Sequence, residues 1–138
     1  MSIFNYTRQR YVVLQNASAA TNLGEPILSA DFKTALLDLQ ASATLDGELV
    51  VAVSDQYEAP DVTQPFGPDN EFFEVGYSDT RNQVYYSSAS RYNPASSVPG
   101  GSGQFNVENT GYRWIIAGVI NRVAGTVDKL SVNLYDNQ

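Results

Sequence analysis

The chain has 138 residues, a formal net charge of −7 and no cysteine or histidine. Ser-His-Asp catalysis, Cys-His catalysis and the usual zinc sites all need histidine or cysteine, so the composition excludes these classes. The acidic balance also argues against nucleic acid as a partner, because binding to phosphates relies on lysine and arginine.

The length predicts one domain over residues 1–138, with a short N-terminal arm of about ten residues. No apolar run approaches the roughly 18 residues that a membrane-spanning helix needs. The first residues also lack the continuous apolar core of a signal peptide. We therefore expect no membrane partner.

The N-terminal residues predict an arm that leads into a strand. Residues 7–10 are polar and basic, and residues 11–14 are apolar. One interpretation is an edge strand with a solvated start. The other is an arm that reaches a neighbouring subunit, where its arginines pair with carboxylates. On the second interpretation the contact candidates are Phe4, Tyr6, Arg8 and Arg10.

Residues 16–26 are small and polar and predict a loop. Two strands are expected next, over about 34–44 and 48–54, because both segments alternate apolar and polar residues. Asp46-Gly47 between them is a strong hairpin signal. The sequence therefore predicts that these two strands pair with each other.

Residues 55–71 contain three prolines and one glycine and predict a long loop. Long loops in small domains are usually either functional or disordered. Because Tyr57 and Phe66 are large aromatic residues in this loop, we expect them to contact a partner. A second long loop is predicted over residues 91–103, which are rich in glycine, serine and proline.

Three further strands are predicted over 72–77, 83–87 and 104–108, and the densest apolar stretch follows at 112–135. In that stretch two strands are expected to form a hairpin around Ala124-Gly125-Thr126. The first is apolar on both faces, so we expect it to be covered on both sides, by a second sheet or by another molecule. The second alternates as a half-buried strand does.

About eight strands with frequent turn signals predict an all-β fold. The expected architecture is an antiparallel two-sheet β-sandwich of jelly-roll type with two long loops.

No catalytic or cofactor-binding arrangement is apparent, and we expect neither an enzyme nor a bound cofactor. The loop acids are typical of a solvated surface. Asp69-Asn70-Glu71 offers oxygen ligands suited to calcium, but it lacks the spacing of an EF-hand. A second possibility is a sugar-stacking platform made of Tyr85, Tyr86, Tyr92 and Trp114. Because consecutive strand residues point to opposite faces, one of Tyr85 and Tyr86 is expected in the core.

Several segments together resemble small β-sandwich structural proteins of tailed bacteriophages, which include capsid decoration proteins and head or tail components. These segments are Asp31-Phe32-Lys33, Leu39 to Thr44 with Asp46-Gly47, Phe105 to Glu108, Arg113-Trp114-Ile115 and Leu130 to Leu134. The resemblance covers about two thirds of the chain, in the style of its strands and turns.

This resemblance implies a non-enzymatic capsid decoration (cement) protein on the capsid surface of a virion, assembled in the host cytoplasm. The implied partners are the major capsid protein and copies of the chain itself, as a homo-oligomer and, by analogy, a trimer. Two alternatives remain open: a tail or neck component, and a carbohydrate-binding β-sandwich module.

Overall fold

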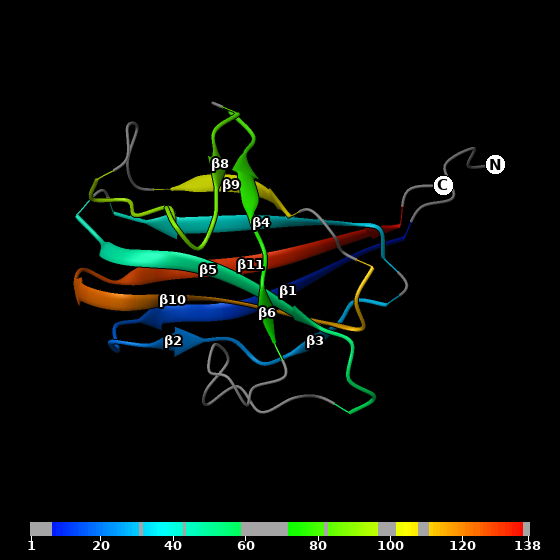
Figure 1. Cartoon of the computed structure of the whole chain (residues 1–138). Helices are drawn as coiled ribbons and strands as arrows, with labels where there is room; N and C mark the ends of the chain where they lie inside the picture. Colours follow the sequence, from blue (N-terminus) through cyan, green and yellow to red (C-terminus); the bar gives the residue numbers. More distant parts are fainter. Residues whose placement is uncertain are drawn as a thin grey trace.

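The structure of the chain, a computed structural model, describes residues 7–30, 32–42, 44–58, 72–81, 83–96, 102–107 and 111–136. Within these ranges eleven strands form two antiparallel sheets that pack face to face (Figure 1). The predicted all-β sandwich is therefore confirmed. In the same ranges, no helix is long and apolar enough to cross a membrane.

Six strands form the first sheet, here called sheet A. In spatial order they are β1 (Thr7–Ala17), β11 (Val127–Asp136), β4 (Thr34–Ala41), β9 (Gly103–Val107), β7 (Tyr77–Asp79) and β8 (Tyr85–Tyr86). Five strands form sheet B. They are β2 (Asn22–Leu23), β10 (Trp114–Ala124), β5 (Asp46–Ser54) and β6 (Phe73–Glu74), together with β3 (Ile27–Leu28), which also pairs with β10.

The strand pairs are nested along the sequence. β1 pairs with β11, β2 with β10, β4 with β9, and β5 with β6. Successive pairs lie alternately in sheet A and sheet B. This arrangement is a long antiparallel ribbon rolled into two sheets, which is the jelly-roll topology expected from the sequence.

Both predicted hairpins are wrong, because the chain changes sheets at each turn. β4 lies in sheet A and β5 in sheet B, and the turn between them is closed by a bond from Leu45 N–H to Ser42 O (3.1 Å). Asp46 and Gly47 lie inside β5. A β-carbon added at Gly47 would come within 2.8 Å of a Val119 side-chain carbon. Gly47 therefore permits close packing of β5 on β10 rather than a tight turn.

The second predicted hairpin also crosses between the sheets, from β10 to β11, through residues 125–126. Gly125 has a φ of +81°, and a β-carbon there would lie 2.6 Å from Leu45 Cα. The two crossings therefore pack against each other at one end of the sandwich. Two further differences concern the predicted loop over 16–26 and the predicted strand over 72–77. β2 lies within that loop and β3 directly follows it, whereas the strand is divided between β6 and β7.

The core lies between the sheets and is built from the inward side chains of both. Its buried members include Leu37 and Leu39 of β4, Leu49 and Val51 of β5, Ile115 and Val119 of β10, and Leu130, Val132 and Leu134 of β11. The outward face of β10 is also covered. Ile116 is fully buried in a second cluster with Ala52 and Phe72, against which Trp114 packs. The prediction that this strand is covered on both faces is confirmed.

One side of the sandwich is closed by hydrogen bonds to the edge of β5. Val75 N–H donates to Val51 O (3.0 Å), and Leu49 N–H donates to Tyr92 O (2.9 Å). The buried Tyr77 hydroxyl donates to Leu49 O (2.5 Å) and accepts a bond from Tyr92 N–H (2.9 Å). The segment after β8 is thereby fixed to sheet B.

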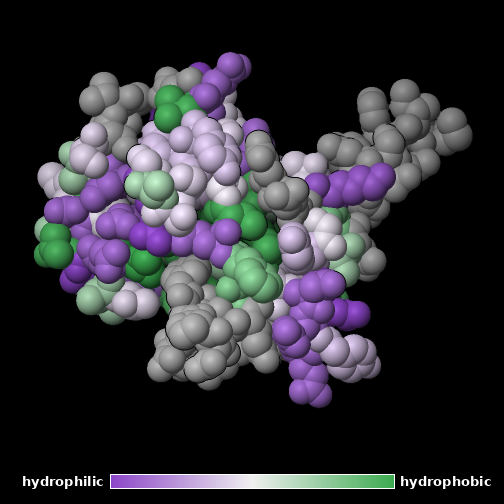
Figure 2. Space-filling model, in the orientation of Figure 1, coloured by the Kyte–Doolittle hydropathy of each residue, from purple (hydrophilic) through white to green (hydrophobic). Residues whose placement is uncertain are grey.

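An ion cluster reinforces this closed side. The Arg91 guanidinium forms two bonds of 2.8 Å to the carboxylate oxygens of Glu74 and a third of 2.8 Å to Glu48. The hydrogen bond to Glu74 is the main reason why the pKa of Arg91 is raised. On the face drawn in Figure 2, one hydrophobic patch lies near the centre beside hydrophilic residues, and smaller hydrophobic areas lie elsewhere.

Candidate functional site

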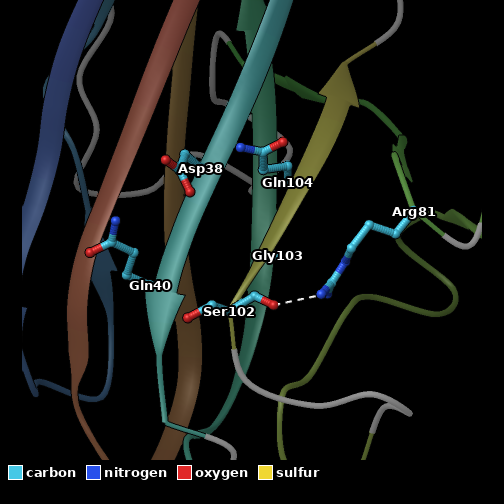
Figure 3. Close-up of a pocket in the computed structure, with 6 residues that line it drawn as sticks. All are labelled: Asp38, Gln40, Arg81, Ser102, Gly103 and Gln104. Atoms are coloured by element: carbon cyan, nitrogen blue, oxygen red, sulfur yellow. Dashed lines mark hydrogen bonds between the residues drawn. The ribbon is translucent and has the colours of Figure 1, made fainter.

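A polar groove lies on the outer face of sheet A, over β4 and β9 (Figure 3). Its volume is about 530 Å³, and it is lined by Asp38, Gln40, Arg81, Ser102, Gly103 and Gln104. The alternation of the two strands creates it. Asp38 lies between Leu37 and Leu39, and Gln104 directly precedes Phe105. Because the three apolar side chains point into the core, Asp38 and Gln104 point outward. These two are also register partners on adjacent strands.

Arg81 is held at one side of the groove by its own turn. Its backbone N–H donates to Asp79 Oδ1 (2.7 Å), and Asp79 is almost fully buried. The guanidinium then reaches across to the carbonyl of Ser102 (3.0 Å), the bond drawn in Figure 3. About half of the Arg81 side chain remains exposed.

Ser102 forms the end of the groove. Its hydroxyl accepts a bond from Ala41 N–H (3.1 Å) and lies 3.3 Å from Ala41 O, to which it donates. The hydroxyl thus takes the place of a backbone partner for the N–H and the carbonyl of Ala41, just before β9 begins. Because these bonds use the hydroxyl, Ser102 contributes mainly shape to the groove.

Arg10 of β1 lies beside the groove, on the far side of β11. Its guanidinium is 3.8 Å from the Asp38 carboxylate and donates a long bond of 3.4 Å to Ser131 Oγ. This predicted contact residue therefore has partners within the chain. Its side chain is still 41% exposed, so it remains accessible from outside.

A second candidate surface is the open edge of the sandwich, defined here as β1 with the neighbouring segment 25–28. β1 is the edge strand of sheet A, and within the described residues β11 is its only paired strand. Next to it lies a mainly apolar hollow of about 240 Å³, lined by Tyr11, Val12, Val13, Glu25, Pro26, Ile27 and Leu28. Val12 and Leu28 are about half exposed, at 49% and 48%.

The other predicted contact residues are dispersed. Arg8 lies in β1, opposite Tyr135. Tyr57 is 83% exposed, and the Arg113 guanidinium carbon lies 5.3 Å from the centre of its ring. Phe4, Tyr6 and Phe66 lie outside the described residues, as does the calcium candidate Asp69-Asn70-Glu71. Within the described residues no group of three or more acidic side chains could hold a metal ion.

The four aromatic residues considered as a sugar-stacking platform do not share a surface. Tyr92 is buried in the core, and Tyr86 packs against it at a ring distance of 5.5 Å. Tyr85 is exposed at the edge of sheet A, whereas Trp114 lies on sheet B and donates a bond to Gln56 O (3.0 Å). As predicted, one of the two consecutive tyrosines packs inward.

The comparisons with known proteins add one finding. No protein-family model matches the chain, and no curated protein sequence matches it. Among solved structures, the crystal structure of the SPBc2 prophage-derived protein YomS is similar, with a TM-score of 0.68 over 99% of both chains. The sequence identity is 10%, so the likeness shows a shared fold alone.

Proposed function

We propose that this chain is a non-enzymatic structural protein of a bacteriophage particle, and more specifically a capsid decoration (cement) protein. The observation that carries the proposal is the full-length likeness to a prophage-derived protein, which covers 99% of both chains. The proposed partners are the major capsid protein and copies of this chain, arranged as a homo-oligomer.

The open edge suits a protein that assembles with others. Its outer backbone groups offer hydrogen bonds to an extended segment, and the adjacent hollow offers a place for an apolar side chain. Arg10 adds a partly exposed positive charge near this edge in an acidic chain. Contacts by Phe4, Tyr6, Arg8, Tyr57 and Phe66 are part of the same proposal.

The proposed mechanism is stabilisation by mass action. A protein that binds the assembled shell but not its dissociated subunits stabilises the shell by RT ln(1 + [L]/Kd), which is about 2.7 kcal/mol at a hundredfold excess over Kd. This mechanism needs complementary surface and no reaction chemistry. It agrees with a chain that lacks cysteine and histidine.

The test uses particles of the phage or prophage whose genome encodes the chain. Purified particles are analysed by mass spectrometry, and particles made without the chain are compared with normal ones for the temperature at which DNA is released. We expect the chain in purified particles and a lower release temperature without it. Adding the purified chain back should restore that temperature and saturate at a fixed ratio to the shell protein.

Two results would contradict parts of the proposal. If the chain is abundant in infected cells but absent from purified particles, the virion role is wrong. If immunogold labelling places it on tails or necks rather than heads, the particle role stands and the decoration role is wrong.

A further inference from the structure

We propose that the polar groove on the outer face of sheet A binds a neutral oligosaccharide. This goes beyond a role in assembly, because it gives the chain a small-molecule binding site of its own. The inference rests on the side chains that line the groove, on their charge balance and on how firmly they are held (Figure 3).

The first argument is the chemical character of the lining. Gln40 and Gln104 each offer a carbonyl acceptor and an NH₂ donor, Asp38 offers two acceptors, and Arg81 offers several donors. A sugar hydroxyl is both donor and acceptor, so it can pair with each of these groups. Among the described lining residues there is no bulky apolar or aromatic side chain, so this part of the groove offers little to an apolar ligand.

The second argument is the charge balance. The lining residues that the structure describes include one carboxylate, Asp38, and one guanidinium, Arg81. An anionic ligand would therefore meet Asp38, and a cationic ligand would meet Arg81. Outside the lining, Arg10 lies 3.8 Å from Asp38 and Asp79 lies 4.0 Å from Arg81, so the charges beside the groove balance as well. A neutral polyhydroxylated ligand avoids both repulsions.

The third argument is that the groove is preformed while its amides remain available. Gln40 and Gln104 stand on paired strands, and Arg81 is anchored through Asp79 and Ser102. Both glutamines are exposed, and no hydrogen bond between described residues involves their side-chain amides. Donors and acceptors on a rigid sheet bind with little loss of conformational entropy.

The structure also indicates the mode of binding. Because the four candidate stacking aromatics do not meet at one surface, the sugar would be held by hydrogen bonds at its edges. An open groove of this kind buries only part of a ligand. We therefore expect a dissociation constant of about 1 mM or somewhat below.

The experiment is a titration of the isolated, ¹⁵N-labelled full chain, followed by NMR. The probes are chitotriose, maltotriose and cellotriose, each added to about 10 mM, tenfold above the expected dissociation constant. The side-chain NH₂ signals of Gln40 and Gln104 report directly on the groove. We expect at least one probe to shift both signals along a saturating curve.

The variants Gln104→Ala and Arg81→Met should weaken that binding about tenfold or more, since each removes a hydrogen-bonding group. Gln15→Ala is the matched control, because Gln15 is an exposed glutamine on β1, outside the groove. It should leave the titration unchanged. All three positions are exposed, and the unshifted backbone spectrum confirms the fold of each variant.

The proposal is overturned if none of the three probes shifts the groove signals. It is equally overturned if the shifts map to residues outside the groove or survive both groove substitutions. Because the titration uses the isolated chain, its outcome is independent of whether the chain is a component of phage particles.

Discussion

At the scale of single residues, Tyr77 links the two sheets through its hydroxyl. That group is buried, donates to the Leu49 carbonyl and accepts from the Tyr92 amide. Tyr77→Phe keeps the ring but removes both bonds, which should cost about 1–3 kcal/mol in the free energy of unfolding. Urea unfolding measures this change. Tyr85→Phe is the control, and because Tyr85 is exposed it should change stability by no more than about 0.5 kcal/mol. Equal effects of the two substitutions would contradict the role of the Tyr77 hydroxyl.

The same hydroxyl gives a prediction about alkaline pH. Burial raises the pKa of Tyr77 above its ordinary value, and burial raises the pKa of Tyr92 in the same direction. In the unfolded chain a tyrosine ionises near a pKa of about 10. The contribution of these two tyrosines to the free energy of unfolding is therefore fully present below about pH 10. It is lost as the pH rises further, because the unfolded state then releases protons that the folded state retains.

Urea unfolding between about pH 9 and pH 11.5 should show this loss, at up to about 1.4 kcal/mol per pH unit for each such tyrosine. Tyr77→Phe should make the decline shallower, because one of the contributing groups is removed. Tyr92 remains, so some decline should persist. A decline of the same steepness in the variant would show that Tyr77 is not among the groups responsible.

At the scale of strands, the docking of β2 on β10 depends on Gly118. A β-carbon added there would lie 2.2 Å from the Asn22 carbonyl oxygen and 2.9 Å from Leu23 Cα. Gly118→Val should therefore push β2 off β10 and cost about 1–3 kcal/mol by overpacking. Gly111→Ala is the matched control, since a β-carbon at Gly111 meets nothing within 4 Å. Thermal unfolding should show a clearly lower Tm for Gly118→Val and almost no change for Gly111→Ala. A similar Tm for both would argue against close packing at Gly118.

The strands themselves could be predicted from sequence, because alternation is a local property. Leu130, Val132 and Leu134 alternate with polar residues, and all three are buried between the sheets. Strand pairing is not local. The Asp46-Gly47 pair has the composition of a hairpin turn, yet the jelly roll sends the preceding strand to one sheet and the following strand to the other. In the folded chain Gly47 packs closely against Val119 instead of forming a tight turn.

The candidate groove could not be predicted from the sequence either, because it too depends on strand pairing. Outward positions such as Asp38 and Gln104 could be recognised as polar residues on predicted strands. Their meeting depends on the pairing of β4 with β9, which are more than sixty residues apart in the chain. Arg81 enters the groove from a turn after β7, and nothing in its local sequence indicates that position. The open edge was partly predicted, since an edge strand was one of the two interpretations of the N-terminal residues.

At the scale of the whole molecule, the two sides of the sandwich differ. The side of β5 is closed by β6, by Tyr92 and by the Arg91 ion cluster. The opposite side ends in β1, whose register shifts between Val12 and Leu14. Such a bulge, together with charged residues, limits indiscriminate pairing of an exposed edge. The open edge is thus suited to a specific contact, and copies of this chain are the proposed partner easiest to test.

If copies of the chain meet through the open edge, introducing charge there should separate them. Val12 and Leu28 are half exposed beside the apolar hollow, so Val12→Glu and Leu28→Glu should each be tolerated in the folded chain. In an interface, either carboxylate would be buried without a partner, at a cost of several kcal/mol. Sedimentation equilibrium should therefore show association of the unmodified chain and at least a hundredfold weaker association of each variant, equivalent to about 2.8 kcal/mol.

Val123→Glu is the matched control, because Val123 is 73% exposed near the end of β10, away from the hollow, and it should leave association unchanged. A monomeric unmodified chain, or association that persists in both edge variants, would rule out this edge as the contact between copies.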